Sequence, residues 1–231
     1  MKLPKLREEV LEANLELVRR GLVLYTFGNA SGIAHEDGLV VIKPSGVPYD
    51  TMKPEDLVVV DLQGNIVEGE LRPSSDLATH LILYKAFPSL GGVAHTHSRA
   101  ATSWAQAGRE IPCLGTTHAD YFHGCVPVTK PMTPAQIRTD YETNTGRAIL
   151  RCLGKQDPLN VPGVLVAGHA PFCWGETPAT AAHNAVVLEE IAAMALQTLI
   201  ANPKARSISK QLHEKHFFRK HGNKAYYGQK K

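Results

Sequence analysis

The stretch Gly91-Gly92-Val93-Ala94-His95-Thr96-His97-Ser98 decides the fold and concentrates its chemistry. Two glycines lead into an apolar pair, and a His-x-His follows. Because successive side chains of a strand point to opposite faces, residues two apart share a face. A strand that ends here directs the imidazoles of His95 and His97 into one pocket. Imidazole is a common ligand of zinc and related metals, although two ordinary hydrogen-bonded histidines would have the same sequence.

The composition is that of a globular protein. The chain has 231 residues, 43% hydrophobic and 20% charged, which suffices for one large domain or two small ones. The order of its expected elements, given below, favours one domain spanning 1–231. It has no uninterrupted apolar run of the ~18 residues that a membrane helix needs, and its first residues, MKLPKLREEV, lack the features of a signal peptide. The four cysteines have no CxxC spacing. We expect a cytoplasmic protein with reduced thiols.

The end of the chain is strongly basic. Residues 203–231 contain nine Lys and Arg against a single acid, Glu214. A basic tail can bind nucleic acid, but this one contains no recognisable nucleic-acid module. We expect its partner to be a small anionic substrate or an acidic neighbouring subunit, with neither nucleic acid nor membrane.

Hydrophobic periodicity and turn residues predict an α/β domain with helices on both faces of a largely antiparallel sheet. The expected helices span residues 5–20, 74–87, 98–107, 134–153 (interrupted near Gly146), 178–200 and 207–219. The expected strands span residues 22–27, 39–43, 57–61, 66–70, 93–95, 126–128 and 163–167.

Other candidate site residues stand at the ends of these elements. His169 follows an expected strand as His95 does, and Asp76 begins an expected helix. Three histidines and one carboxylate are a plausible ligand set for a divalent metal, although Asp76 alone could simply complement the helix dipole. Three small-residue loops with amide or hydroxyl donors, and Lys43 near the second of them, could hold an anion. These loops are Gly28-Asn29, Ser45-Gly46 and Ser74-Ser75.

Several longer motifs resemble the L-ribulose-5-phosphate 4-epimerases, a family of the class II aldolase/adducin superfamily. They follow one another in order from about residue 8 to residue 229. The motifs are VLEANLELVRRGLVLYTFGNASG, VIKPSGVPYD, RPSSDLATH, GGVAHTHSRAATSWAQAG, GTTHADYFHG, the stretch through Gly168-His169-Ala170-Pro171-Phe172, and KHGNKAYYGQ.

The resemblance implies a three-layer α/β/α sandwich around a mainly antiparallel sheet, and a homotetramer with its sites at subunit interfaces. It implies a Zn²⁺ site, also open to Mn²⁺ or Co²⁺, and a site to which the basic helix and tail contribute. The implied metal ligands are Asp76, His95, His97 and His169. The implied catalytic acid/base pair is Asp120 and Tyr227. The implied substrate-binding residues are Gly28, Asn29, Lys43, Ser45, Gly46, Ser74, Ser75, Thr116, Glu142 and His216. One departure from the family pattern is Ala167 before the ligand His169, where a more polar run is expected.

The activity implied is the interconversion of L-ribulose 5-phosphate and D-xylulose 5-phosphate. Two alternatives stay open. One is a sugar-phosphate aldolase of the same superfamily, of the fuculose- or rhamnulose-phosphate type, which generally has Glu at the position of Asp76. The other is a non-catalytic interaction module of the adducin-head type, whose mark would be lost metal ligands; all four are present here.

Overall fold

The computed structural model describes residues 1–221, 225 and 226. Its centre is a seven-stranded sheet in the order β4-β3-β2-β1-β5-β7-β6. Every pair of neighbouring strands is antiparallel, which confirms the predicted sheet. The strands are β1 (Asn29–Ala34), β2 (Leu39–Ile42), β3 (Val58–Asp61), β4 (Ile66–Glu68), β5 (Gly92–His95), β6 (Gly163–Leu165) and β7 (Pro171–Gly175).

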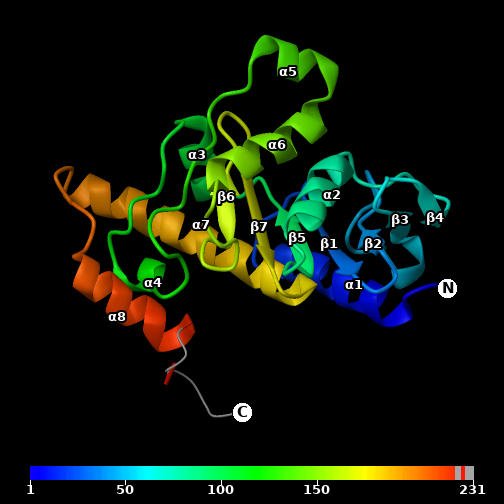
Figure 1. The fold of residues 1–231 in the computed structure, drawn as a ribbon, viewed down its shortest axis with the longest axis horizontal. Coiled ribbons are helices and arrows are strands. Elements are labelled where there is room, and N and C mark those ends of the chain that lie inside the picture. The colour runs from blue at the N-terminus through cyan, green and yellow to red at the C-terminus, as the bar shows by residue number, and fades with distance from the viewer. Residues whose placement is uncertain (222–224, 227–231) are drawn as a thin grey trace.

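Helices cover both faces of this sheet (Figure 1). On one face, α1 and α7 pack together, and Leu6 and Val10 of α1 meet Gly32 of β1. On the other, α2 packs against α6 and reaches the sheet where Tyr84 contacts Ser31, the neighbour of Gly32. The helices are α1 (Pro4–Arg19), α2 (Leu77–Ala86), α3 (Arg99–Gln106), α4 (Thr116–Ala119), α5 (Pro134–Thr139), α6 (Tyr141–Leu153), α7 (Pro178–Ala201) and α8 (Lys210–His221), with a 3₁₀ turn, η1, at Pro54–Asp56.

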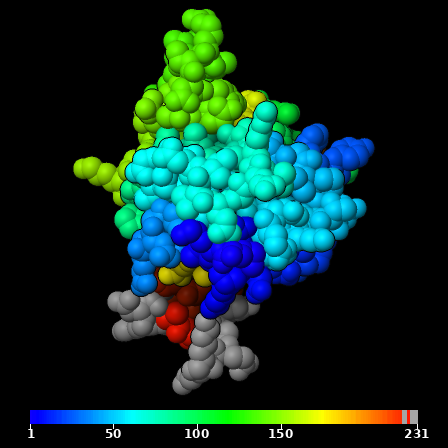
Figure 2. All heavy atoms as spheres, turned by 90° about the vertical axis from the view of Figure 1, so that its right-hand side faces the viewer, coloured from blue at the N-terminus to red at the C-terminus, as the bar shows by residue number. Residues whose placement is uncertain are grey.

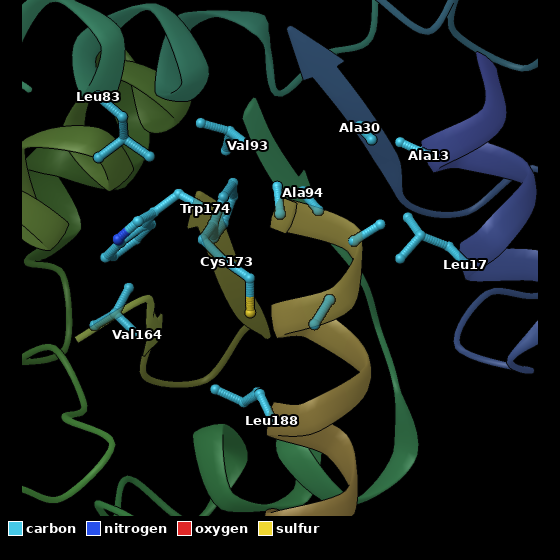
Figure 3. Close-up of a cluster of buried hydrophobic side chains, with 14 of the residues drawn as sticks. Ala13, Leu17, Ala30, Leu83, Val93, Ala94, Val164, Cys173, Trp174 and Leu188 are labelled. Carbon is cyan, nitrogen blue, oxygen red and sulfur yellow. The ribbon is translucent and has the colours of Figure 1, made fainter. Parts of the chain in front are cut away.

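The core follows from strand alternation, as Figure 3 shows. Val93 pairs with Trp174 and Ala94 with Cys173 in the β5–β7 register. Trp174 points toward Leu83 of α2, whereas Cys173 points toward α7. Both central strands are therefore buried on both faces, which explains why GGVAH contains no polar residue before its histidine.

The strand predicted at residues 22–27 is wrong; β1 begins at Asn29 instead. Leu24, Tyr25 and Phe27 are exposed, and Tyr25 has a positive φ of 53°. The stretch NASGIA forms β1 because helices α1 and α7 lie very close to the sheet at this point. A Cβ on Gly32 would lie 2.7 Å from Pro178 of α7 and 2.8 Å from Leu6 of α1. Close approach of two helices thus outweighs the low strand propensity of glycine.

Other boundaries also differ from the predictions. The helical region 134–153 is interrupted at Asp140, not near Gly146, and residues 126–128 form only isolated bridges. Strand β7 was not predicted, and the last helix begins at Lys210. Among the described residues, α7 is long and apolar enough to cross a membrane by length and composition alone. Its packing against α1, β5 and β7 is that of a core helix.

Two parts of the chain extend from this body in opposite directions. Helix α5 and the loops beside it project at one end, and α8 lies at the other, as Figures 1 and 2 show. Helix α8 docks against α4. The position of α8 matters below because Asp120 and His216 lie where α4 and α8 meet.

Candidate metal centre

Three histidines converge at the end of the central strands. One ring nitrogen each from His95, His97 and His169 lies within 4.8 Å of the other two. His95 is the last residue of β5, and His97 follows two residues later, so both rings leave the chain on the same side, as predicted. His169 stands in the turn between β6 and β7, where Gly168 has a φ of 71° and the His169 amide donates to the Val166 carbonyl.

The ring of His95 is fixed from two sides. It stacks on Phe172 of β7, with centroids 4.1 Å apart, and its Nδ1 lies 2.9 Å from the Pro171 carbonyl oxygen. A carbonyl only accepts, so Nδ1 carries the proton and Nε2 presents its lone pair to the cluster. Burial lowers the pKa of His95 to about 3. The ring is therefore neutral at physiological pH, the form in which imidazole binds metals.

Asp76, the N-cap residue that precedes α2, brings a carboxylate to the same place. Its Oδ2 accepts a hydrogen bond of 2.7 Å from the Asn29 amide and lies 4.0 Å from Nε2 of His95. Burial opposes its ionisation, but the nearby histidines and the Asn29 amide hold the pKa of Asp76 below its usual value. An ionised carboxylate beside three neutral imidazoles is a donor set that fits Zn²⁺, with positions left for substrate oxygens.

These four side chains line a cavity of about 480 Å³ together with the three small-residue loops. Eight of the ten predicted substrate-binding residues border it: Gly28, Asn29, Lys43, Ser45, Gly46, Ser74, Ser75 and Glu142. Lys43 is buried, and its ammonium lies 4.7 Å from the centre of the Tyr49 ring. Burial lowers the pKa of Lys43 to about 8. Hydroxyl donors and one cation give this side of the cavity the chemistry of an anion site.

Three predicted residues that the structure describes, Thr116, Asp120 and His216, do not border this cavity. Asp120 follows α4 and accepts hydrogen bonds from His216 Nδ1 at 3.0 Å and from Arg219 Nη2 at 2.7 Å. Burial opposes ionisation of Asp120, but the α8 cations lower its pKa. Thr116 is the first residue of α4, so the structure joins Thr116, Asp120 and His216 at the α4–α8 end. Tyr227 lies outside the described residues.

The structure adds residues that the sequence analysis missed. Tyr141, the first residue of α6, borders the cavity, and its hydroxyl lies 3.3 Å from Nδ1 of His169. Behind Asp76, the buried His80 Nδ1 pairs with the Ser31 hydroxyl at 2.7 Å, and that hydroxyl also meets Tyr84. His80 stands four residues after Asp76, so helical spacing could have placed it beside the site. Tyr141 carries no such signal in the sequence.

Comparison with a protein-family model gives one match. Residues 8–196 match the model described as "Class II Aldolase and Adducin N-terminal domain". The match includes every residue of the histidine cluster, Asp76 and the loops around the cavity. It ends within α7, before α8 and the basic tail.

Solved structures with the same fold include three for which the alignment covers nearly the whole of both chains. An L-fuculose 1-phosphate aldolase is 25% identical, with a TM-score of 0.78, over 92% of this chain and 94% of that one. YgbL from Klebsiella pneumoniae, described as a candidate aldolase/epimerase/decarboxylase, is 26% identical, with a TM-score of 0.72, over 93% and 99%. The L-fuculose-1-phosphate aldolase of Thermus thermophilus is 24% identical, with a TM-score of 0.67, over 88% of this chain and 100% of that one. At this identity the likeness shows the fold alone.

Proposed function

The chain belongs to the class II aldolase and adducin family, and from that premise we propose that it is a metal-dependent 4-epimerase of a phosphorylated ketopentose. The reaction is the interconversion of L-ribulose 5-phosphate and D-xylulose 5-phosphate. The observation that carries the proposal is a single cavity in which a His₃-Asp ligand set faces three anion-binding loops and a buried lysine. The single domain acts in the cytoplasm, and its basic segment 203–231 contributes to the site.

The chemistry of the substrate dictates the type of reaction. The hydrogen on C4 lies β to the C2 carbonyl and is not acidic, so direct proton abstraction cannot invert C4. Cleavage of the C3–C4 bond can. Loss of the C4 hydroxyl proton makes C4 an aldehyde carbon, while the bonding electron pair passes to the C1–C3 fragment. When the bond re-forms on the opposite face of the aldehyde, the C4 oxygen regains a proton, so atoms and charges balance.

The metal would be held by Asp76, His95, His97 and His169. When bound, a divalent cation supplies Lewis-acid stabilisation of the negative charge that cleavage places on the substrate oxygens. Zn²⁺ fits this nitrogen-rich donor set, and Mn²⁺ or Co²⁺ would also accept it. We propose Zn²⁺ as the resident ion.

The loops and Lys43 have the role of holding the phosphate. The loop residues Gly28, Asn29, Ser45, Gly46, Ser74 and Ser75 border the cavity together with Lys43. A phosphate held here keeps the two-carbon aldehyde fragment from leaving while its carbonyl turns. Retention of that fragment is what separates an epimerase from an aldolase.

Inversion requires a proton acceptor on one face of C4 and a donor on the other. By resemblance, Asp120 and Tyr227 are this pair. The ion pair with Arg219 favours an ionised Asp120, and a carboxylate can accept a proton. Because Asp120 does not border the cavity of its own chain, we propose that a second copy supplies it, in a homotetramer with sites at subunit interfaces. Thr116 and His216 would enter the site with it.

A sugar-phosphate aldolase is the alternative function, favoured by the resemblance to an L-fuculose 1-phosphate aldolase. Asp at position 76 and the THADYF and AYYGQ motifs favour the epimerase. The shorter Asp suits metal binding alone, whereas a longer Glu can also serve as a base. The presence of all four ligands argues against a non-catalytic module of the adducin-head type.

One incubation tests the proposal. Metal-loaded protein is mixed with L-ribulose 5-phosphate, and D-xylulose 5-phosphate and free glycolaldehyde phosphate are measured. An epimerase accumulates the ketopentose epimer. Release of glycolaldehyde phosphate without epimer would show cleavage without epimerisation and favour the aldolase, and an unchanged substrate would contradict the epimerase. L-Fuculose 1-phosphate in a parallel reaction tests the aldolase directly.

A further inference from the structure

The orientation of His169 depends on a residue from a distant part of the chain. The two residues before it, Ala167 and Gly168, have no side-chain hydrogen-bonding group, so its own turn offers the ring no side-chain partner there. The Tyr141 hydroxyl lies 3.3 Å from Nδ1 of His169, and the two rings are tilted by 45° with centroids 5.9 Å apart. The polar group expected near this ligand thus comes from α6.

The direction of this hydrogen bond follows from the state of the imidazole. A neutral ring has one N–H and one lone pair. If Nε2 gives its lone pair to a metal, Nδ1 keeps the proton and donates it to the phenol oxygen. The phenol oxygen has lone pairs that can accept this proton. His95 is fixed in the same way by the Pro171 carbonyl.

Helix α6, which begins at Tyr141, packs against α2, the helix that directly follows Asp76. The Thr79 hydroxyl of α2 donates to the Glu142 carbonyl oxygen at 2.7 Å. At Gly146, an added Cβ would lie 2.9 Å from Ile82, so the two helices are in close contact. These contacts hold Tyr141 in a constant position relative to α2, so its hydroxyl can fix the orientation of the His169 ring.

We propose that Tyr141 is a positioning residue of the metal centre: its hydroxyl accepts the Nδ1 proton of His169 and so sets the tautomer and the ring orientation that turn Nε2 toward His95 and His97. The inference rests on the proposed metal site. Partners of this kind typically change metal affinity by about 10- to 100-fold.

The test measures metal affinity in solution, without an activity assay. Metal-free parent protein, Tyr141→Phe and Tyr25→Phe are titrated with Zn²⁺ against a chromophoric chelator. Tyr141→Phe keeps the ring and its packing, and we expect it to bind Zn²⁺ about 10- to 100-fold more weakly. Tyr25→Phe is the matched control, because Tyr25 is 87% exposed, and the affinity of this variant should equal the parent's.

A double-mutant cycle separates action through His169 from a general structural effect. In a His169→Ala background, Tyr141→Phe should weaken Zn²⁺ binding no further. An equal loss in both backgrounds would show that Tyr141 does not act through His169 and would overturn the inference. So would parental affinity in Tyr141→Phe. A parent protein that binds no Zn²⁺ at all would instead contradict the proposed function, which keeps the two failures distinct.

Discussion

The Nε2 atoms of His95 and His97 lie 3.1 Å apart. With Nδ1 of His95 donating to the Pro171 carbonyl, Nε2 of His95 carries a lone pair, and without a metal His97 can donate to it. Two lone pairs held this close would repel one another. A cation bound by both nitrogens removes that repulsion, so the pair can hold a metal once His97 also presents its lone pair at Nε2.

The first prediction concerns this pair. We expect His97→Ala to lose most of its bound divalent metal together with its epimerase activity, because one of the three nitrogens is removed. Metal content is measured by elemental analysis after dialysis, with His183→Ala on α7 as the control. A fully metallated His97→Ala protein would exclude His97 from the ligand set.

The second prediction concerns the phosphate. Ser75→Ala and Lys43→Met should raise KM for L-ribulose 5-phosphate while metal content stays at the parental level. Loss of a charge-assisted hydrogen bond costs about 1.5–3 kcal/mol, or roughly ten- to a hundredfold in KM. Steady-state kinetics at fixed metal concentration make the measurement. Parental KM values in both variants would mean that neither residue binds the phosphate.

The third prediction is a pH dependence. Burial lowers the pKa of Lys43 to about 8, so the ammonium is charged below this pH and neutral above it. KM for the phosphorylated sugar should therefore rise as the pH increases through about 8. Lys43→Arg remains charged throughout this range, so its KM should not rise there. The same increase in both proteins would assign the effect to another group.

The fourth prediction concerns stability and is independent of function. His118 donates from Nε2 to the Gly124 carbonyl oxygen at 2.9 Å, and burial lowers its pKa to about 4. Below its unfolded pKa of about 6.5, the unfolded chain binds a proton that the folded chain does not. The free energy of unfolding should fall between pH 6.5 and 4, by up to about 3 kcal/mol for this residue.

Urea unfolding of metal-free protein across this pH range measures that loss. His118→Gln retains an N–H donor for Gly124 but cannot titrate, so its stability should decline less steeply. His80, whose pKa burial also lowers to about 4, contributes a similar decline in both proteins. Identical pH profiles for parent and variant would contradict the role given to His118.

The comparison of sequence and structure shows which features local patterns can predict. Strand alternation was sufficient to bring His95 and His97 together, because His97 comes only two residues after His95, the end of β5, and its ring leaves the chain on the same side. The strand at 22–27 was wrong because apolar, β-prone side chains there are exposed, while Gly32 occupies the crowded position between two helices. Propensity is local, whereas the space between the layers is set by the whole fold.

Tyr141 illustrates the other limit. It meets His169 across 28 positions of sequence, and this contact depends on how closely α6 approaches α2 at Gly146. Neither residue's neighbours in the sequence indicate the pairing. Asp120 is similar: family resemblance suggested its role, but its ion pair with Arg219 of α8 could not be read from spacing.

The last prediction concerns the acid/base pair and the assembly. Asp120→Asn keeps the shape of the side chain but cannot accept a proton, and Tyr227→Phe keeps the ring but cannot donate one. General acid–base groups contribute about 10²–10⁴ in rate, so each variant should lose at least that much epimerisation with metal content and oligomeric state unchanged. Near-parental rates in both variants would contradict the two-sided mechanism.

Complementation tells whether Asp120 acts on a neighbouring copy. His97→Ala retains Asp120 but lacks a complete metal site, whereas Asp120→Asn retains the metal site, and each homo-oligomer should be nearly inactive. In co-expressed mixtures, some interfaces pair an intact cavity with an intact Asp120 from the neighbour. With random assembly of equal amounts, about a quarter of the sites should combine an intact cavity with an intact Asp120. Activity should therefore recover to about a quarter of the parental level. If every site were formed within one chain, the mixture would remain as inactive as its components.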